Sequence, residues 1–266
     1  MSRRLLTALH IISRVGQAEG RHSPLGDINP RAKILVVICF LVAMLSMPIE
    51  RLSELMLFSV YPIISASMGG IGYGRVLRRS LIVVPFVALI ALPNLFLQRE
   101  VAFQVGGVAV RVGLLTLLSI VLRGILSLQA VIILVATTSL RSVCSALREM
   151  GVPALLVTQI FFISRYMGLL VEEALAMQRA RAARGFGRER YPLKMWARLI
   201  SQLLLRSARR AEEIGRAMAA RQFRGDMPPS LHQSYERWRG RDTLYLVAWC
   251  GTLLMLRVLH FAERLF

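Results

Sequence analysis

Acidic residues are scarce in this sequence, and charged residues of both signs are fewer than in an ordinary soluble domain. Only 18% of the 266 residues are charged and 55% are hydrophobic, whereas soluble domains carry about 25% charged residues. Lys and Arg number 34 against 15 Asp and Glu, which gives a formal net charge of +19. The composition excludes a disordered chain and a small secreted domain, and it is typical of a protein that crosses a membrane several times.

Cysteine is also rare and forms no recognisable pattern. Cys39, Cys144 and Cys250 lie far apart, and no pair has the C-x-x-C spacing. The odd number and the wide spacing indicate neither a disulfide framework nor a zinc site. We expect all three side chains to be buried as small apolar groups.

Motifs for nucleotide and metal chemistry are missing from the sequence. It contains no G-x-x-x-x-G-K-[ST] phosphate loop and no H-E-x-x-H, and the glycines of Met68–Gly74 lack the G-x-G-x-x-G spacing, so we expect a turn there. The chain is therefore expected to be no enzyme and to hold no metal or cofactor of its own. The histidines are scattered along the sequence: His10, His22, His232 and His260.

Long apolar runs dominate what is present. They predict an all-α integral membrane protein with about five transmembrane helices. We place the first four within 34–139 and the last within 243–266, with Lys33 at the start of the first. The individual runs are 34–49, 52–68, 81–97, 114–138 and 243–262.

Basic residues are distributed unequally between the segments that join these runs. Segments 1–33, 69–80 and 139–242 contain 6, 3 and 19 Lys and Arg, whereas 49–52 and 98–113 contain 1 and 2. The positive-inside rule therefore places the N-terminus, the 69–80 loop and the 139–242 segment in the cytoplasm, with the C-terminus outside. Arg14 interrupts the N-terminal apolar run, so we interpret 1–33 as an interfacial amphipathic segment rather than a signal peptide.

One segment alternates between apolar and polar residues as a strand does. This segment, 100–112, contains Gly106-Gly107 at its centre. The pattern predicts a short β-hairpin on the outer side of the membrane.

The basic segment has a helical pattern interrupted by glycine and proline. Breaks at Gly151-Val152-Pro153 and Gly185-Phe186-Gly187 predict helices over 140–150, 154–184 and 193–222. We therefore expect a cytoplasmic helical domain over 140–226, followed by a linker over 227–242.

The two long helices end in similar sequences. Arg184 stands in Ala182-Ala183-Arg184-Gly185, and Arg221 stands in Ala219-Ala220-Arg221-Gln222. An arginine behind small residues at a helix end can reach into a partner and pair with a carboxylate. Alternatively, each arginine complements its helix dipole and remains solvated.

These segments resemble the transmembrane (T) component of energy-coupling-factor (ECF) transporters, and the cobalt-type branch in particular. Ala183-Arg184-Gly185 and Ala220-Arg221-Gln222 are similar to the paired Ala-Arg-Gly motifs of that family. The resemblance also rests on three other segments in the same order as in the family: Asn29-Pro30-Arg31-Ala32-Lys33, Leu147 to Pro153 with Gly151 and Pro153, and Arg165 to Glu173.

The resemblance implies a subunit of the cell inner membrane with no catalytic activity of its own. It implies two ATPase subunits and a substrate-binding (S) membrane subunit as partners, with Arg184 and Arg221 paired to acidic residues of the ATPases. Two departures put details in doubt, because Asn29 replaces the usual Asp and Gln222 replaces the usual Gly or Ser.

Other functions compete with this interpretation. The same subunit could serve nickel or a vitamin in place of cobalt. A membrane enzyme acting on lipids would need a catalytic constellation, but the sequence gives Glu54 and Glu100 no partner. Nucleic-acid binding is disfavoured, since the basic residues of 139–242 are interspersed with acidic ones and no aromatic stacking platform accompanies them.

Overall fold

The computed structural model describes residues 24–48, 52–97, 101–105, 108–184, 193–223, 225 and 238–262. The chain divides into two compact units. We call Ala18–Ser139 with Glu236–Phe266 the core unit, and Leu140–Tyr235 the long-helix unit, which also takes in Met1–Gln17. Residues 1–23 lie outside the described part, and with them most of the predicted interfacial segment.

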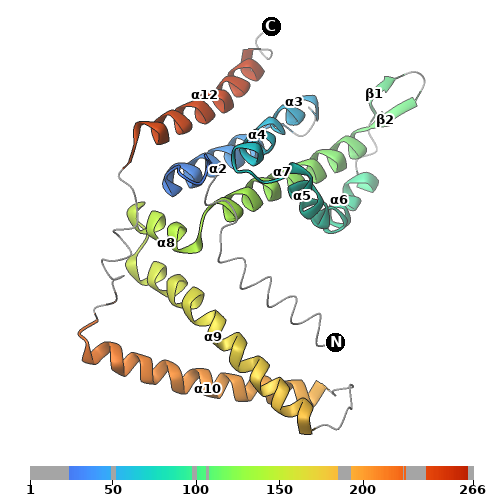
Figure 1. The fold of residues 1–266 in the computed structure, drawn as a ribbon. Helices are drawn as coiled ribbons and strands as arrows, with labels where there is room; N and C mark the ends of the chain where they lie inside the picture. Colours follow the sequence, from blue (N-terminus) through green and yellow to red (C-terminus); the bar gives the residue numbers. More distant parts are fainter. Residues whose placement is uncertain are drawn as a thin grey trace. The chain divides into compact units, whose positions relative to one another are not determined.

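The core unit consists of helices and one hairpin (Figure 1). Strands β1 and β2 pair antiparallel over the segment where the sequence alternates, while Gly106-Gly107 lies outside the described residues. The elements of the core unit are α2 (Pro30–Leu45), α3 (Leu52–Leu57), α4 (Val60–Met68), α5 (Tyr73–Ser80), η1 (Leu81–Val83), α6 (Val84–Leu97), β1 (Val101–Val105), β2 (Val108–Arg111), α7 (Val112–Thr137) and α12 (Gly240–Ala262).

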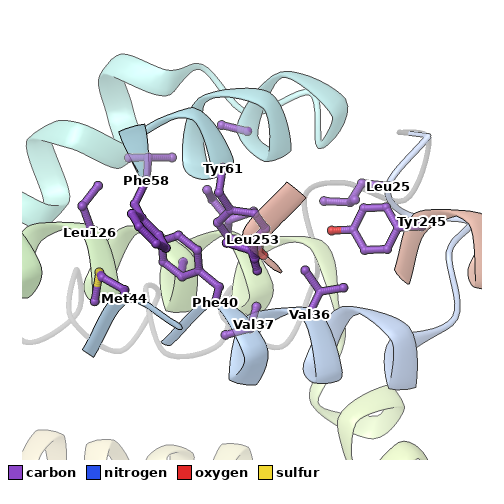
Figure 2. Packing of buried hydrophobic residues seen from close by; sticks show 14 of the residues in the cluster. Leu25, Val36, Val37, Phe40, Met44, Phe58, Tyr61, Leu126, Tyr245 and Leu253 are labelled. Carbon is purple, nitrogen blue, oxygen red and sulfur yellow. The ribbon is translucent and has the colours of Figure 1, made fainter. Parts of the chain in front are cut away.

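Aromatic side chains hold the centre of the core unit together (Figure 2). Phe40 of α2 is fully buried and stacks on Tyr61 of α4, with ring centroids 4.4 Å apart. Tyr61 in turn meets Trp249 of α12 edge-on at 4.8 Å. Three segments far apart in the sequence therefore share one aromatic cluster, a geometry that stabilises beyond simple area burial.

Helices α6 and α7 approach closely at Gly124. A Cβ atom at this position would lie 3.1 Å from Cγ2 of Val87 on α6. Small residues permit such close helix packing in membrane proteins. The backbone of α7 therefore packs directly against the side chain of Val87 at this point.

The long-helix unit contains α8 (Leu140–Glu149), α9 (Ala154–Arg184) and α10 (Leu193–Ala220). The predicted helices over 140–150, 154–184 and 193–222 are thus confirmed to within two residues. In the part of the chain that the structure describes, helices long and apolar enough to cross a membrane are Tyr73–Leu95, Val112–Thr137 and Ala154–Arg184. The prediction of an all-α membrane protein is confirmed.

Several details differ from the sequence-based expectation. The apolar run 52–68 forms two helices, because the chain turns at Phe58-Ser59 between α3 and α4. The run 114–138 forms one uninterrupted helix, α7. Helix α9 falls in the segment that we assigned to the cytoplasm from its charge, yet the helix Ala154–Arg184 is long and apolar enough to cross a membrane.

Cys144 is buried as predicted, but the prediction is wrong for Cys39, which is exposed, and Cys250 is only partly buried. In a membrane helix an exposed apolar side chain faces lipid, so these two positions need no protein cover.

Candidate functional site

The predicted motif at the start of the first span forms the N-terminus of α2. Asn29 is the N-cap, and its Oδ1 accepts a hydrogen bond of 3.0 Å from the backbone N–H of Arg31. Pro30 follows at the first helical position, where a missing N–H costs nothing. Asn and Asp cap helices about equally well. The departure from Asp at this position therefore keeps the cap.

A carboxylate that sequence reasoning missed completes this cap. Asp242 of α12 accepts the backbone N–H of Asn29 at 2.8 Å through Oδ1 and the backbone N–H of Arg239 at 2.9 Å through Oδ2. Both donors precede the first turn of a helix, so one carboxylate caps α2 and α12 together. Asp242 is only 4% exposed. Its signal in the sequence was its place directly before the last apolar run.

Lys33 lies next to this carboxylate and is itself buried. Its Nζ donates to the carbonyl oxygen of Thr137 at 3.4 Å, and Asp27 and Asp242 attract its charge. A buried ammonium needs such partners because desolvation is costly. We call Asn29, Lys33, Thr137, Arg239 and Asp242 the Asp242 cluster.

The Asp242 cluster stands where the chain passes between the two units. Thr137 ends α7 three residues before the long-helix unit begins at Leu140. Asp242 follows shortly after the chain returns to the core unit at Glu236. Thr137 bonds to Lys33 and Asp242 bonds to Asn29, so the chain is held to the N-terminus of α2 both before and after the long-helix unit.

The Gly-Val-Pro segment forms a helix stop followed directly by a helix start. Gly151 adopts φ +93°, and the N–H groups of Gly151 and Val152 donate to the carbonyls of Arg148 and Leu147 at 3.2 and 3.1 Å. This is a Schellman motif, which places a left-handed residue after the helix end. Pro153 immediately precedes α9. The motif therefore turns α8 sharply into α9.

An apolar cluster holds α8 against the first turns of α9. Cys144 and Val157 are fully buried there, together with Phe161. Burial raises the pKa of the Cys144 thiol, which keeps it protonated. Phe162 extends the cluster to Phe223 beyond α10, with ring centroids 6.1 Å apart.

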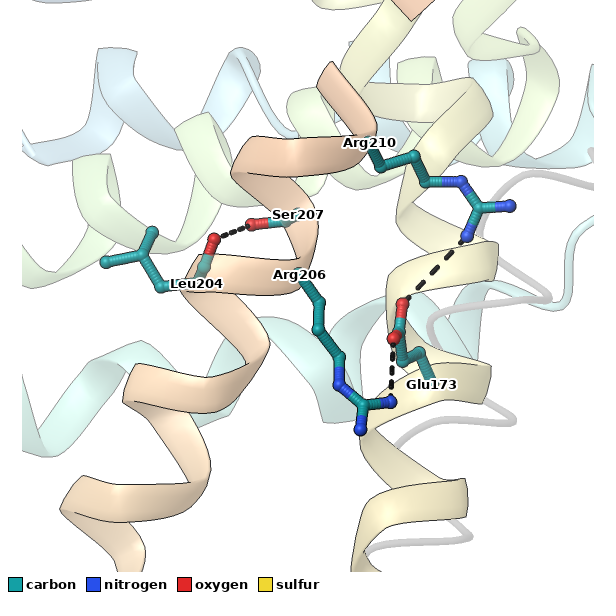
Figure 3. A network of polar contacts seen from close by, with 5 residues as sticks. All are labelled: Glu173, Leu204, Arg206, Ser207 and Arg210. Carbon is teal, nitrogen blue, oxygen red and sulfur yellow. Dashed lines mark hydrogen bonds and ion pairs between the residues drawn. The ribbon is translucent and has the colours of Figure 1, made fainter. Parts of the chain in front are cut away.

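Ion pairs join α9 to α10 (Figure 3). Glu173 accepts a hydrogen bond from Nη1 of Arg206 at 3.3 Å through Oε1, and Nη1 of Arg210 lies 3.9 Å from its Oε2. Arg206 and Arg210 are one turn apart on α10, so the Glu173 carboxylate interacts with both ends of that turn. Nearer the end of α9, Arg181 donates to the carbonyl of Met195 at 3.2 Å.

Arg221 follows the last residue of α10 and is exposed. Gln222 adopts φ +56°, and the N–H groups of Gln222 and Phe223 donate to Ala219 and Met218 at 3.0 Å each. The predicted coupling motif thus forms a second Schellman motif with Gln222 at its left-handed position, where glycine is usual. Thr158, near the start of α9, donates a hydrogen bond of 2.9 Å to the carbonyl oxygen of Gly225. This bond fixes Gly225 against the start of α9.

Arg184 is the last residue of α9, and Gly185 lies outside the described residues. Phe223, two residues after Arg221, contacts Phe162 near the start of α9. Phe162 and Arg184 are 22 residues apart on this helix, or roughly 33 Å at the α-helical rise. The two arginines therefore stand near opposite ends of α9.

Neither arginine's guanidinium group has a hydrogen bond or an ion pair with another described residue, and Ala182, Ala183 and Ala220 beside them are exposed. Their guanidinium groups are thus open to a partner. Among the described residues no group of three or more His, Cys, Asp or Glu is arranged to hold a metal ion.

These features define an all-α membrane protein whose long-helix unit presents two separated, exposed arginines. The family model described as "Cobalt transport protein" (CbiQ) matches residues 21–232. The chain belongs to this family.

Two relatives illustrate the similarity. The chain is 27% identical over 225 residues to the energy-coupling factor transporter transmembrane protein EcfT of Thermosediminibacter oceani, a match that covers 79% of this chain and 84% of that protein. It is 37% identical over 95 residues to the cobalt transport protein CbiQ of Rhodobacter capsulatus. The latter match spans 35% of this chain and 39% of that relative, well under two thirds of its length.

Proposed function

We propose that this protein is the transmembrane energy-coupling subunit of an ECF-type importer and has no catalytic activity of its own. In this role it joins two ATPase subunits to a substrate-binding membrane subunit in the cell inner membrane. The observation that supports this proposal most strongly is the placement of Arg184 and Arg221. Both are exposed, and neither is neutralised by a described residue.

The separation of these arginines fits two partners rather than one. Arg221 stands near Phe162, and Arg184 lies roughly 33 Å from Phe162 along α9, so the two arginines are too far apart to enter a single groove. Each has small neighbours that leave room for an enclosing surface. Guanidinium is suited to forked pairing with carboxylates in such a groove. We therefore assign one ATPase to each arginine.

The contacts between α9 and α10 suit the transmission of motion. Glu173 pairs with Arg206 and Arg210, and Phe162 meets Phe223. A displacement applied at either arginine therefore moves both helices together. Within the core unit, the Asp242 cluster ties α2, α7 and α12 together.

Cobalt is the cargo we propose, with an N-terminus in the cytoplasm and five spans. The family description and the 37% identical relative support cobalt, and the one-sided distribution of arginines supports the topology. Selectivity for cobalt would reside in the substrate-binding subunit rather than in this chain.

Expression of the tagged full chain with its neighbours in its own host tests the assignment. We expect mass spectrometry of the solubilised complex to identify two ATP-binding subunits, and the purified chain alone to hydrolyse no ATP. Cells with the complete complex should accumulate cobalt in preference to nickel. A chain that purifies without ATP-binding subunits, or that hydrolyses ATP unaided, would contradict the proposal.

A further inference from the structure

Helix α5 presents three arginines at the base of a lipid-facing helix, and they have no role in the proposed coupling site. Arg75, Arg78 and Arg79 are all exposed on this eight-residue helix. Val76 and Ser80 are fully buried on its opposite face. The helix is therefore amphipathic, with one side fixed to protein and the other side basic.

Contacts with α7 fix the orientation of α5. Nε2 of Gln129, a buried residue of α7, donates to Oγ of Ser80 at 3.4 Å. Val76 belongs to the same hydrophobic cluster as Leu126 and Ala130 of α7. Since the buried face is anchored at two positions, the arginine face is held outward.

The usual explanation for basic residues in a last helical turn does not apply to α5. Arg78 and Arg79 would complement a helix dipole if the helix ended there. The backbone instead continues in helical conformation through η1 into α6, so the segment Tyr73–Leu95 forms one long apolar helix (Figure 1). No free helix end faces these side chains.

The residues that follow are apolar and strongly exposed. Ile82 is 74% exposed and Phe86 is 67% exposed. In a membrane protein such a surface faces the hydrocarbon core. Arg78 and Arg79 stand within about one or two helical turns of it, which is the level of the lipid headgroups.

The sequence around α5 contains no acidic residue. No Asp or Glu occurs between Glu54 and Glu100. Neither Arg78 nor Arg79 forms an ion pair with another residue that the structure describes. Phosphate groups of anionic lipids supply the missing charge, and guanidinium binds phosphate through forked hydrogen bonds.

We propose that the exposed arginine face of α5 is a binding surface for the headgroups of anionic phospholipids in the inner leaflet. The proposal rests on the membrane location of the chain and, for the choice of the inner leaflet, on the proposed topology, but it does not depend on the proposed coupling function. Basic residues next to a span bind an anionic leaflet with about five-fold gain in affinity for each residue.

Native mass spectrometry of the purified full chain tests the proposal, with phosphatidylglycerol and phosphatidylcholine as the two lipids. We expect wild type to prefer phosphatidylglycerol, and Arg78→Gln/Arg79→Gln to reduce that preference about 25-fold. The matched control is Arg198→Gln/Arg209→Gln, which removes two exposed arginines from α10 and should change the preference less than about two-fold.

A salt titration of the wild-type chain gives a second readout that needs no variant to fold. The preference for phosphatidylglycerol should weaken steeply between low and high ionic strength, because exposed charges are screened. Equal binding of both lipids by wild type would overturn the proposal. So would an α5 variant that keeps its lipid preference but no longer retains its protein partners, because α5 would then be a docking helix for protein.

Discussion

Asp242 Oδ1 accepts a 2.8 Å hydrogen bond from the backbone N–H of Asn29, a residue 213 positions earlier in the chain. The same carboxylate accepts the N–H of Arg239, and it attracts the buried ammonium of Lys33. Two helix starts thus share one acid at the point where the chain passes between its units. Hydrogen bonds to a charged group contribute more than neutral ones, at about 1.5 to 3 kcal/mol each.

We therefore predict that Asp242→Ala destabilises the protein by about 3 kcal/mol, since two charged hydrogen bonds are lost and Lys33 stays buried with less compensation. Thermal unfolding of the full chain in detergent, followed by circular dichroism, measures the effect. Glu172→Ala is the matched control, because Glu172 is an exposed carboxylate of α9 outside the Asp242 cluster and should cost less than about 1 kcal/mol. Equal losses in the two variants would show that Asp242 caps neither helix.

Gly151 provides a second test, because only its backbone conformation demands glycine. Its φ is +93°, while no atom lies within 4 Å of an added Cβ. We expect Gly151→Ala to cost about 1 to 2 kcal/mol, and Gly168→Ala, an equally open position inside α9, to gain about 0.5 to 1 kcal/mol. Opposite signs in thermal unfolding are the expected outcome. A neutral or stabilising Gly151→Ala would exclude the left-handed turn between α8 and α9.

Gln222 occupies a left-handed position with φ +56°, where glycine fits without strain. We predict that Gln222→Gly stabilises the end of α10 by about 1 kcal/mol. Gln222→Ala keeps the Cβ and should bring no such gain. Hydrogen exchange of the backbone amides at Gln222 and Phe223 reports the effect locally. Faster exchange in the glycine variant would contradict the Schellman geometry.

Cys39 of α2 and Cys250 of α12 lie on two helices that pack against each other, and their thiols are neighbours. Mild oxidation of the membrane-embedded chain should therefore link them in an intramolecular disulfide, which peptide mass spectrometry detects. Cys144→Ser should leave the yield unchanged, because Cys144 is buried among apolar side chains in the long-helix unit. Disulfides that involve Cys144 in the folded protein would contradict the packing of α2 against α12.

Much of this structure could be predicted from the sequence, because many of the signals that define helices are local. Glycine and proline end helices locally, so Gly151 and Pro153 located the boundary between α8 and α9 correctly. Apolar length likewise predicted α7. These signals depend only on neighbours in the chain.

Long-range contacts could not be predicted in the same way. The pairing of Asp242 with Asn29 and of Glu173 with Arg206 depends on tertiary packing across 213 and 33 residues. By contrast, the split between α3 and α4 lies just before Pro62, which falls in the first turn of α4, so a local helix breaker marks it. For Arg184 and Arg221, the sequence supplied the residues, whereas only the structure showed that they lie near opposite ends of α9.

Truncation of the two arginines has a calculable consequence if each is held by carboxylates of an ATPase. Removing one partner of a buried charge pair costs about 2 to 5 kcal/mol, and tenfold affinity corresponds to about 1.4 kcal/mol. Arg→Lys should recover only part of the loss, since an ammonium cannot reproduce forked pairing. Solvated arginines that answer only the helix dipole would cost less than about 1 kcal/mol.

The most direct measurement is the affinity of the full chain for its ATPase subunits, together with cobalt uptake in cells, for Arg184→Ala, Arg221→Ala and the double variant. Arg179→Ala/Arg198→Ala is the matched control, because these arginines are exposed on the same two helices. We predict at least about a 25-fold loss of ATPase affinity for each single variant and no uptake for the double variant, with the control near wild type. Wild-type ATPase retention and uptake in the double variant would contradict a coupling role for Arg184 and Arg221.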